Sequence, residues 1–336
     1  MMNDLQNIKK TGVSLLIVLI SFSLKAKTTP LDSIPSPSAS LLALYDMYEE
    51  CDVCGCGSSG GGMGYGTIGD SNFIGVRYIN QQYRSRDGIY NNSPWIDEHF
   101  NTMQLWSQVP LGERFSVNAI VPIHFHSRAL VDGSDQEISG LGDVNILASY
   151  NLIQTKDTPF VPDENAIKHS LSIGAGLKLP TGSYNRENNT GSVNPSFQLG
   201  TGSWDILLAS NYSVGYKQFG MGVLANYVIK TENNEQYQFG NQFNYGVNFF
   251  RRFENMRMHS YIPVIGLAGE VFGENQSYGI AVQDTKGNVL FGRLGFEADL
   301  GIFNTGINVM LPLAQNLNDG NVEAKSRIGV HFNYKI

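Results

Sequence analysis

The sequence lacks three features that would define other classes of protein. After its N-terminal segment it has no apolar run of about 18 residues, which argues against a helical membrane protein. Charged residues are only 16% of the chain, the net charge is −7, and no Lys/Arg cluster stands out beyond Arg251-Arg252, so nucleic-acid binding is not expected. Hydrophobic residues nonetheless reach 42%, which argues against a disordered chain.

The N-terminal segment has the pattern of a secretory signal peptide. Lys9 and Lys10 precede an apolar run from Val13 to Leu24, and Ala26 is a small residue suited to cleavage. The alternative is an inner-membrane anchor, but the run is shorter than the roughly 20 apolar residues that a spanning helix needs. We therefore expect residues 1–26 to be a removed signal peptide that exports the chain across the inner membrane of a Gram-negative cell.

Twelve later segments alternate apolar and polar residues, which is the period of a β-strand with two different faces. They are residues 72–84, 99–109, 113–126, 142–154, 168–180, 197–215, 219–230, 239–251, 258–272, 288–299, 302–313 and 326–336. Most are long enough, at about 9–11 residues, to cross a bilayer when tilted. We predict an all-β fold in which residues 72–336 form a transmembrane antiparallel up-and-down β-barrel in the outer membrane. The alternative is a secreted pair of β-sandwiches.

The gaps between these segments alternate in length. The long gaps are residues 85–98, 127–141, 181–196, 231–238, 273–287 and 314–325, and most of the gaps between them are shorter. Because long loops of bacterial barrels lie outside the cell, we expect both termini of the chain to be periplasmic. One gap, residues 155–167, is long and breaks this rule.

The alternation also predicts which side chains face lipid and which face the lumen. It turns His124 and His126 inward in the third segment, and it turns Phe239 and Phe243 toward lipid in the eighth. The candidate lumen or selectivity residues are Arg77, His124, His126, Lys178, Asp205, Arg293, Glu297, Asp299 and Arg327. The competing hypothesis is that the lumen charges only pair with one another. A barrel of this size predicts a narrow passage for a small-molecule solute.

The only three cysteines lie close together before the first strand. Cys51, Cys54 and Cys56 belong to residues 27–71, which we interpret as a periplasmic linker rich in Pro, Ser and Gly. Their C-x-x-C-x-C spacing suits a soft metal such as Cu(I) or Zn(II). A disulfide between Cys51 and Cys54 is also open, and it would leave Cys56 to link to a periplasmic partner.

Three glycine-rich motifs resemble those of a known family. They are Ser139-Gly140-Leu141-Gly142-Asp143-Val144, Leu177-Lys178-Leu179-Pro180-Thr181-Gly182 and Leu199-Gly200-Thr201-Gly202-Ser203-Trp204-Asp205. With these motifs in the family's order and spacing, residues 72–336 resemble the outer-membrane β-barrels named for the meta-pathway of phenol degradation, which are described as transporter-like. The resemblance implies passage of small, often apolar or aromatic compounds. The cysteine segment is not part of the family pattern, and it favours a metal-linked role.

No motif in the chain predicts an enzyme. Some twelve-stranded outer-membrane barrels resemble phospholipases with a Ser-His pair on the outer wall. Here the adjacent His-Ser pairs at 126–127, 169–170 and 259–260 would point to opposite faces of a strand, and only pairs between strands stay open. We therefore predict an outer-membrane channel or transporter for small solutes, with no catalytic residue. The alternative is a non-transporting outer-membrane barrel that binds metal or a periplasmic partner through its cysteine segment.

Overall fold

The computed structural model describes residues 72–86, 94–130, 133–154, 167–185, 197–254 and 259–336. All of them belong to the compact unit of residues 37–336, and the unit of residues 1–36 lies outside this range. The predicted signal peptide and linker therefore stay predictions. Among the described residues, no helix is long and apolar enough to span a membrane.

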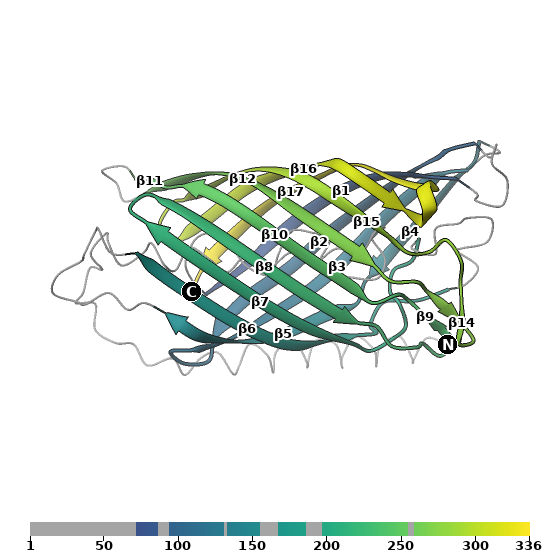
Figure 1. Ribbon diagram of the computed structural model, residues 1–336, viewed down its shortest axis with the longest axis horizontal. Coiled ribbons are helices and arrows are strands. Elements are labelled where there is room, and N and C mark those ends of the chain that lie inside the picture. The colour runs from purple at the N-terminus through teal and green to yellow at the C-terminus, as the bar shows by residue number, and fades with distance from the viewer. Residues whose placement is uncertain (1–71, 87–93, 131–132, 155–166, 186–196, 255–258) are drawn as a thin grey trace, which may run out of the picture. The chain divides into compact units, whose positions relative to one another are not determined.

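Twelve strands form one closed antiparallel ring, each paired with its neighbours along the chain (Figure 1). The strands are β1 (Phe73–Ser85), β2 (Ile96–Pro110), β3 (Phe115–Ala129), β5 (Val144–Gln154), β6 (Lys168–Leu179), β7 (Asp205–Tyr216), β8 (Phe219–Ile229), β10 (Gln242–Arg251), β12 (Ser260–Phe272), β15 (Gly287–Asp299), β16 (Phe303–Leu317) and β17 (Val322–Lys335). The ring closes where β1 pairs with β17, with Phe73 opposite Lys335. Closure leaves no edge strand, which a sheet in lipid requires. The predicted up-and-down barrel is confirmed.

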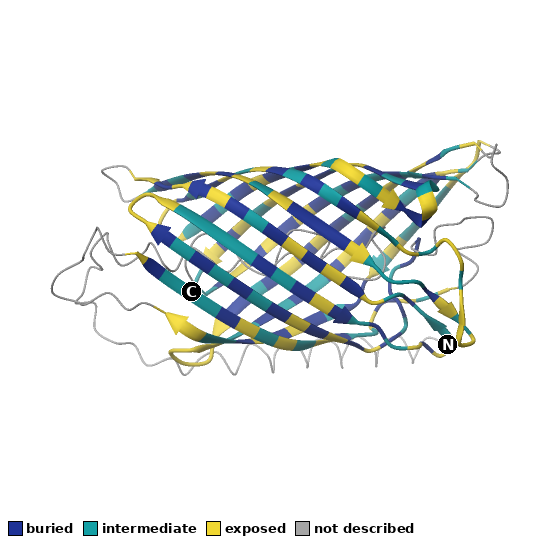
Figure 2. Cartoon of the chain, in the orientation of Figure 1, coloured by how far each residue is buried: buried dark blue, intermediate teal, exposed yellow. Residues whose placement is uncertain are grey.

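Burial alternates along most of the length of the long strands, as the dark and light checks of Figure 2 show. In β10, for example, Phe243, Tyr245 and Phe249 are exposed on the outer face, whereas Asn244 and Asn248 are buried inside. An apolar outer face and a polar interior are the reverse of a soluble protein, and they match a barrel whose outer wall meets lipid. The outer-membrane location is consistent with this pattern.

The two ends of the barrel differ in their connections. At the end where β1 begins, β7 joins β8 through residues 217–218 and β15 joins β16 through residues 300–302; we call this the short-turn end. The opposite end carries most of the additional structure, and we call it the long-loop end. The additional elements are β4 (Asp135–Leu141), β9 (Tyr237–Gln238), β11 (Phe253–Glu254), β13 (Gln276–Ser277), β14 (Ile280–Ala281) and the 3-10 turn η3 (Asn318–Gly320). Of these, β9, β13 and β14 pair as a small three-stranded sheet.

Some predicted strand boundaries were wrong, for a common physical reason. The predicted gap at 127–141 contains β4, which pairs with β3, and the gap at 314–325 shrinks to residues 318–321 because β16 and β17 continue into it. The hydrogen-bonded sheet extends beyond the membrane, where neither face of a strand has to be apolar. A strand with polar residues on both faces has no period-two alternation, so the sequence pattern does not reveal it.

The segment before β7 is the opposite case. The prediction began this strand at Phe197, but residues 197–204 are not strand, and β7 starts at Asp205. Phe239 was also assigned wrongly to the lipid face. It lies before β10, is only 8% exposed, and packs with its ring centroid 5.0 Å from that of Tyr237 and 6.0 Å from that of Tyr184.

The lipid-facing wall leads to a first prediction. Ile265 lies near the middle of β12 and is 60% exposed on the outer face. Ile265→Arg should lower the free energy of unfolding by roughly 2–4 kcal/mol, because an arginine at the bilayer midplane loses its hydration. Urea unfolding of the protein in lipid vesicles measures this cost. The control is Ile280→Arg in β14, which is exposed at the long-loop end; an equal loss for both variants would contradict the assignment.

Candidate functional site

All nine predicted lumen residues are buried. They come from β1, β3, β6, β7, β15 and β17, and none is more than 9% exposed. Since the residues that alternate with them face outward, these side chains lie inside the barrel. Their part in solute selectivity stays a prediction.

Several of these charges pair with other interior groups. Arg327 Nη1 lies 2.8 Å from Glu270 Oε1, and its Nη2 donates to the hydroxyl of Tyr83 at 2.9 Å. At the short-turn end, Lys335 Nζ lies 2.6 Å from Asp299 Oδ2. The pairing hypothesis accounts for these charges, because each needs a partner where water is scarce.

Two further arginines contact neutral interior groups. Arg77 Nε donates to Gln104 Oε1 at 2.7 Å, and its guanidinium lies 4.4 Å from the ring centroid of Trp106. Arg293 Nη1 lies 3.4 Å from Asn248 Oδ1 on β10, which is two strands away along the ring. The interior therefore contains positive groups held by amide and aromatic side chains as well as by carboxylates.

The two inward histidines lie side by side on β3. The ring centroids of His124 and His126 are 4.6 Å apart, and His124 Nδ1 lies 2.9 Å from Thr102 Oγ1. Across the described part of the chain, no group of three or more His, Cys, Asp or Glu side chains is placed to hold a metal. The three cysteines lie outside the described residues, so the Cu(I) or Zn(II) hypothesis and the disulfide hypothesis are unchanged.

The three glycine-rich motifs meet at one place at the long-loop end. Gly142 and Asp143 interrupt the strand between β4 and β5, both of which pair with β3. The Thr181 hydroxyl bridges this break: it donates to Gly142 O at 2.7 Å and accepts from Val144 N at 3.0 Å. The second motif thereby replaces the ladder bonds that the first motif interrupts, and the break turns the Asp143 side chain into the barrel.

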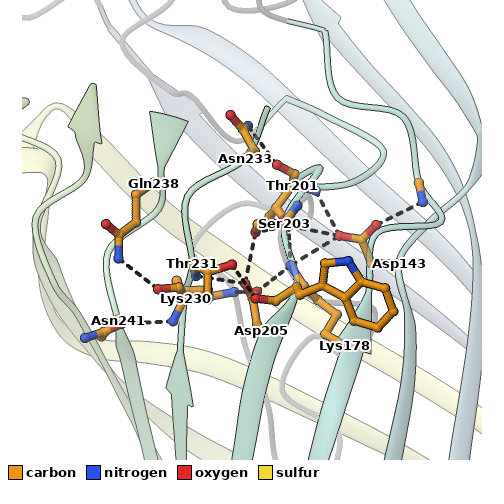
Figure 3. Close-up of polar contacts among 12 residues, drawn as sticks. Asp143, Lys178, Thr201, Ser203, Asp205, Lys230, Thr231, Asn233, Gln238 and Asn241 are labelled. Carbon is orange, nitrogen blue, oxygen red and sulfur yellow. Dashed lines mark hydrogen bonds and ion pairs between the residues drawn. The ribbon is translucent and has the colours of Figure 1, made fainter. Parts of the chain in front are cut away.

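Asp143 binds the second and third motifs together. Its Oδ1 accepts from the backbone N of Gly182 at 2.9 Å, and its Oδ2 accepts from the backbone N of Thr201 at 2.9 Å. Lys178 Nζ lies 3.2 Å from the same Oδ2 and also contacts the Thr201 hydroxyl (Figure 3). One carboxylate thus receives bonds from both the second and the third motif.

A second carboxylate completes the arrangement. Lys178 Nζ lies 2.5 Å from Asp205 Oδ2, and Lys230 Nζ lies 3.4 Å from the same oxygen. Ser203 Oγ donates to Asp205 Oδ1 at 2.9 Å. We call Asp143, Lys178, Asp205 and Lys230 the four-charge cluster. Two acids balance two bases, all at most 2% exposed, so the cluster has formal charge zero (Figure 3).

Glycine is required where these segments touch. A Cβ on Gly142 would lie 2.2 Å from His124 Nε2. A Cβ on Gly200 would lie 2.4 Å from Asp143 Oδ1, and one on Gly182 would lie 2.6 Å from the backbone O of Leu199. The motifs are glycine-rich because their backbones pack directly against one another and against the cluster.

In the connection between β6 and β7, the described residues 197–204 consequently turn several buried side chains into the barrel. Phe197 in this connection is fully buried. Its ring centroid lies 6.1 Å from the ring centroid of Phe100 on β2 and 4.4 Å from the guanidinium carbon of Arg128. It belongs to an interior apolar cluster with members on both sides of the β1–β17 seam. The members are Tyr83, Phe100, Phe197, Ala268, Val289, Phe291, Met310, Leu317, Val322 and Ala324. This cluster fills part of the barrel interior on both sides of the seam.

Sequence patterns missed some of these groups for identifiable reasons. Glu98 and Arg128 are buried register partners on β2 and β3, but they lie one and two residues beyond the predicted strand ends. Glu270 is an inward residue of β12, and the alternation could have identified it. Asp143 and Lys230 stand at strand ends, where alternation stops, so only the glycine-rich motif around Asp143 carried a signal.

The four-charge cluster leads to a second prediction. Lys178→Met should lower the free energy of unfolding by roughly 3–5 kcal/mol, because it leaves buried carboxylates without their shared base. Urea unfolding in lipid vesicles measures the loss. The control is Lys325→Met, which removes a base 3.0 Å from Glu323 in an exposed pair and should have little effect. A loss for Lys178→Met no larger than for Lys325→Met would show that the cluster does not anchor the fold.

Comparison with known proteins agrees with this geometry. The sequence model of the family described as "Putative MetA-pathway of phenol degradation" matches residues 96–262, from the start of β2 into β12. No curated protein matches the sequence. An outer membrane channel from Pseudomonas putida F1 shares the fold with a TM-score of 0.59 at 16% identity, over 79% of this chain and 95% of that one. The beta domain of the Bordetella autotransporter Brka gives a TM-score of 0.46 at 11% identity, over 80% and 100% of the two chains. The resemblance indicated by the three motifs is confirmed: residues 96–262 match the sequence model of the MetA-pathway of phenol degradation family, and the fold is that of an outer-membrane barrel.

Proposed function

We propose that the protein is an outer-membrane channel that passes small solutes. The observation that carries the proposal is the polar interior of a closed barrel: on all twelve strands the inward positions include polar or charged side chains or glycine, whereas the outer face is apolar. Polar groups along the lumen give a solute and its hydrating water hydrogen-bonding partners during passage.

The comparisons support a channel over an enzyme. The similar structure from Pseudomonas putida F1 is described as an outer membrane channel. His331 lies 2.9 Å from an amide oxygen, Asn304 Oδ1, and the contact of 2.9 Å between His124 Nδ1 and Thr102 Oγ1 is buried inside the barrel. We assign no catalytic residue.

The proposed orientation places both ends of the barrel chain in the periplasm. Phe73 and Lys335 lie at the short-turn end, and the opposite end carries the inward connection and the small three-stranded sheet. Bacterial barrels keep their short turns in the periplasm and their longer loops outside. The proposed partners are therefore lipid around the wall and a small solute that enters past the inward connection.

The interior apolar cluster limits the size of that solute. Phe197 reaches the walls of β2 and β3 from the connection between β6 and β7, which lies several strands away around the ring. The four-charge cluster holds the following residues of the same connection. Phe197 is therefore held inside the barrel on an anchored segment, and the channel is narrow in this state.

Removal of the Phe197 phenyl ring tests the proposed function. Phe197→Ala should raise the single-channel conductance in a planar lipid bilayer, because it removes the largest buried side chain among residues 197–204. The control is Trp204→Ala on the same connection, since Trp204 is 57% exposed and should leave conductance unchanged. An absence of conductance in the unmodified protein and in both variants would contradict a channel.

A further inference from the structure

Basic and aromatic side chains gather on the outer wall at the turn between β7 and β8. Tyr216 ends β7, Lys217 and Gln218 form the turn, and Phe219 begins β8, and all four residues are exposed. On the next strand around the ring, Arg251 is the register partner of Phe219 and is also exposed. This corner lies at the short-turn end and faces away from the lumen.

Arg251 is held in place by uncharged neighbours. Its guanidinium carbon lies 4.6 Å from the ring centroid of Phe253 and 5.1 Å from that of Phe219. Its Nη2 lies 3.3 Å from Gln218 Oε1. A cation within about 6 Å of an aromatic ring is attracted to the ring face, so these contacts orient the guanidinium without neutralising it.

Lys217 adds a second positive charge at a position where the backbone favours glycine. It is in the left-handed region with a φ of 53°, in a two-residue hairpin turn. Its Nζ lies 5.3 Å from the ring centroid of Tyr216. A lysine that occupies a strained turn position in place of glycine indicates that its side chain has a role there.

No described carboxylate neutralises this corner. Among the described residues, no Asp or Glu forms an ion pair with Lys217 or Arg251. The acid that follows Phe253 is Glu254, and its Oε1 lies 2.8 Å from Arg252 Nε. Two exposed cations are therefore available to an anion from outside the chain.

The corner belongs to a belt of aromatic side chains around the short-turn end. Outward rings of this belt pair on neighbouring strands, with centroids 4.6 Å, 6.4 Å and 5.8 Å apart in three such pairs. The pairs are Phe115 with Tyr150, Tyr261 with Phe296, and Phe303 with Tyr334. Aromatic girdles of transmembrane barrels lie at the boundary between hydrocarbon and headgroups. Lys217 and Arg251 therefore lie at the level of the lipid phosphates.

The combination of groups favours a lipid phosphate over a free phosphate ion. Arginine binds phosphate oxygens through two parallel N–H bonds, and basic residues near the membrane surface attract anionic lipids. Phe219 is 58% and Phe253 is 42% exposed on the lipid-facing side, where acyl chains can cover both rings. A free phosphate ion would leave these rings uncovered.

We propose that Lys217 and Arg251, with Tyr216, Phe219 and Phe253, form a binding site for the headgroup of an anionic phospholipid. Arg251 binds the phosphodiester, Lys217 supplies the second positive charge, and the acyl chains lie along the phenylalanine rings. In the proposed orientation, the lipid belongs to the leaflet next to the periplasm. The site adds a lipid partner that the channel function does not require.

Native mass spectrometry of the delipidated protein in detergent tests the site. Titration with phosphatidylglycerol should give a saturable one-lipid complex, whereas phosphatidylcholine with the same acyl chains should bind more weakly. Inorganic phosphate should not displace the phosphatidylglycerol. Equal binding of the two lipids would overturn the proposal, and complete displacement by inorganic phosphate would show a free-phosphate site instead. This arm uses the unmodified protein and does not depend on the folding of a variant.

Substitution of the two cations provides the second arm. Lys217→Gln with Arg251→Gln should weaken phosphatidylglycerol binding by about tenfold. The matched control is Arg84→Gln with Lys325→Gln, which removes two cations that lie 2.6 Å and 3.0 Å from Glu323 at the long-loop end. This control should bind phosphatidylglycerol like the unmodified protein. An equal loss in both double variants would show attraction by total charge alone and would overturn the site.

Discussion

Closure of the hydrogen-bonded ring between β1 and β17 is the constraint on which the rest of the structure depends. Inside a bilayer no water is present to satisfy backbone N–H and C=O groups, so a sheet must close on itself. Once closed, alternate residues have only two environments, lipid and lumen, and the apolar residues take the first. The polar interior follows from this geometry, and so does the need to pair the charges that it encloses, as Arg327 pairs with Glu270.

The three glycine-rich motifs replace hydrogen bonds that are lost at one break in that ring. The strand break at Gly142-Asp143 removes ladder bonds, and Thr181 and the four-charge cluster replace them. The same bonds hold residues 197–204 against the barrel interior, which positions Phe197. One set of contacts therefore replaces the missing ladder bonds and holds Phe197 inside the barrel. The glycines are necessary because the backbones pack closely at these contacts.

The sequence predicted those parts of the structure in which each residue faces either lipid or the lumen. Period-two alternation identified all twelve strands, the direction of residues such as His124 and Arg293, and the closed barrel. It failed where a residue is neither in lipid nor on a regular strand. Phe239 packs against loop aromatics, Phe197 enters the lumen from a connection, and Asp143 turns inward at a strand break. In each case a tertiary contact, which no periodicity records, decides the position.

Osmotic swelling of liposomes that contain the purified, unmodified protein tests the central claim most directly. The account predicts that liposomes swell in small uncharged solutes at rates that fall steeply as solute size increases, because the interior apolar cluster narrows a polar passage. Liposomes that swell no faster than protein-free liposomes in every solute, although the barrel is folded, would contradict a channel and show that the interior is closed.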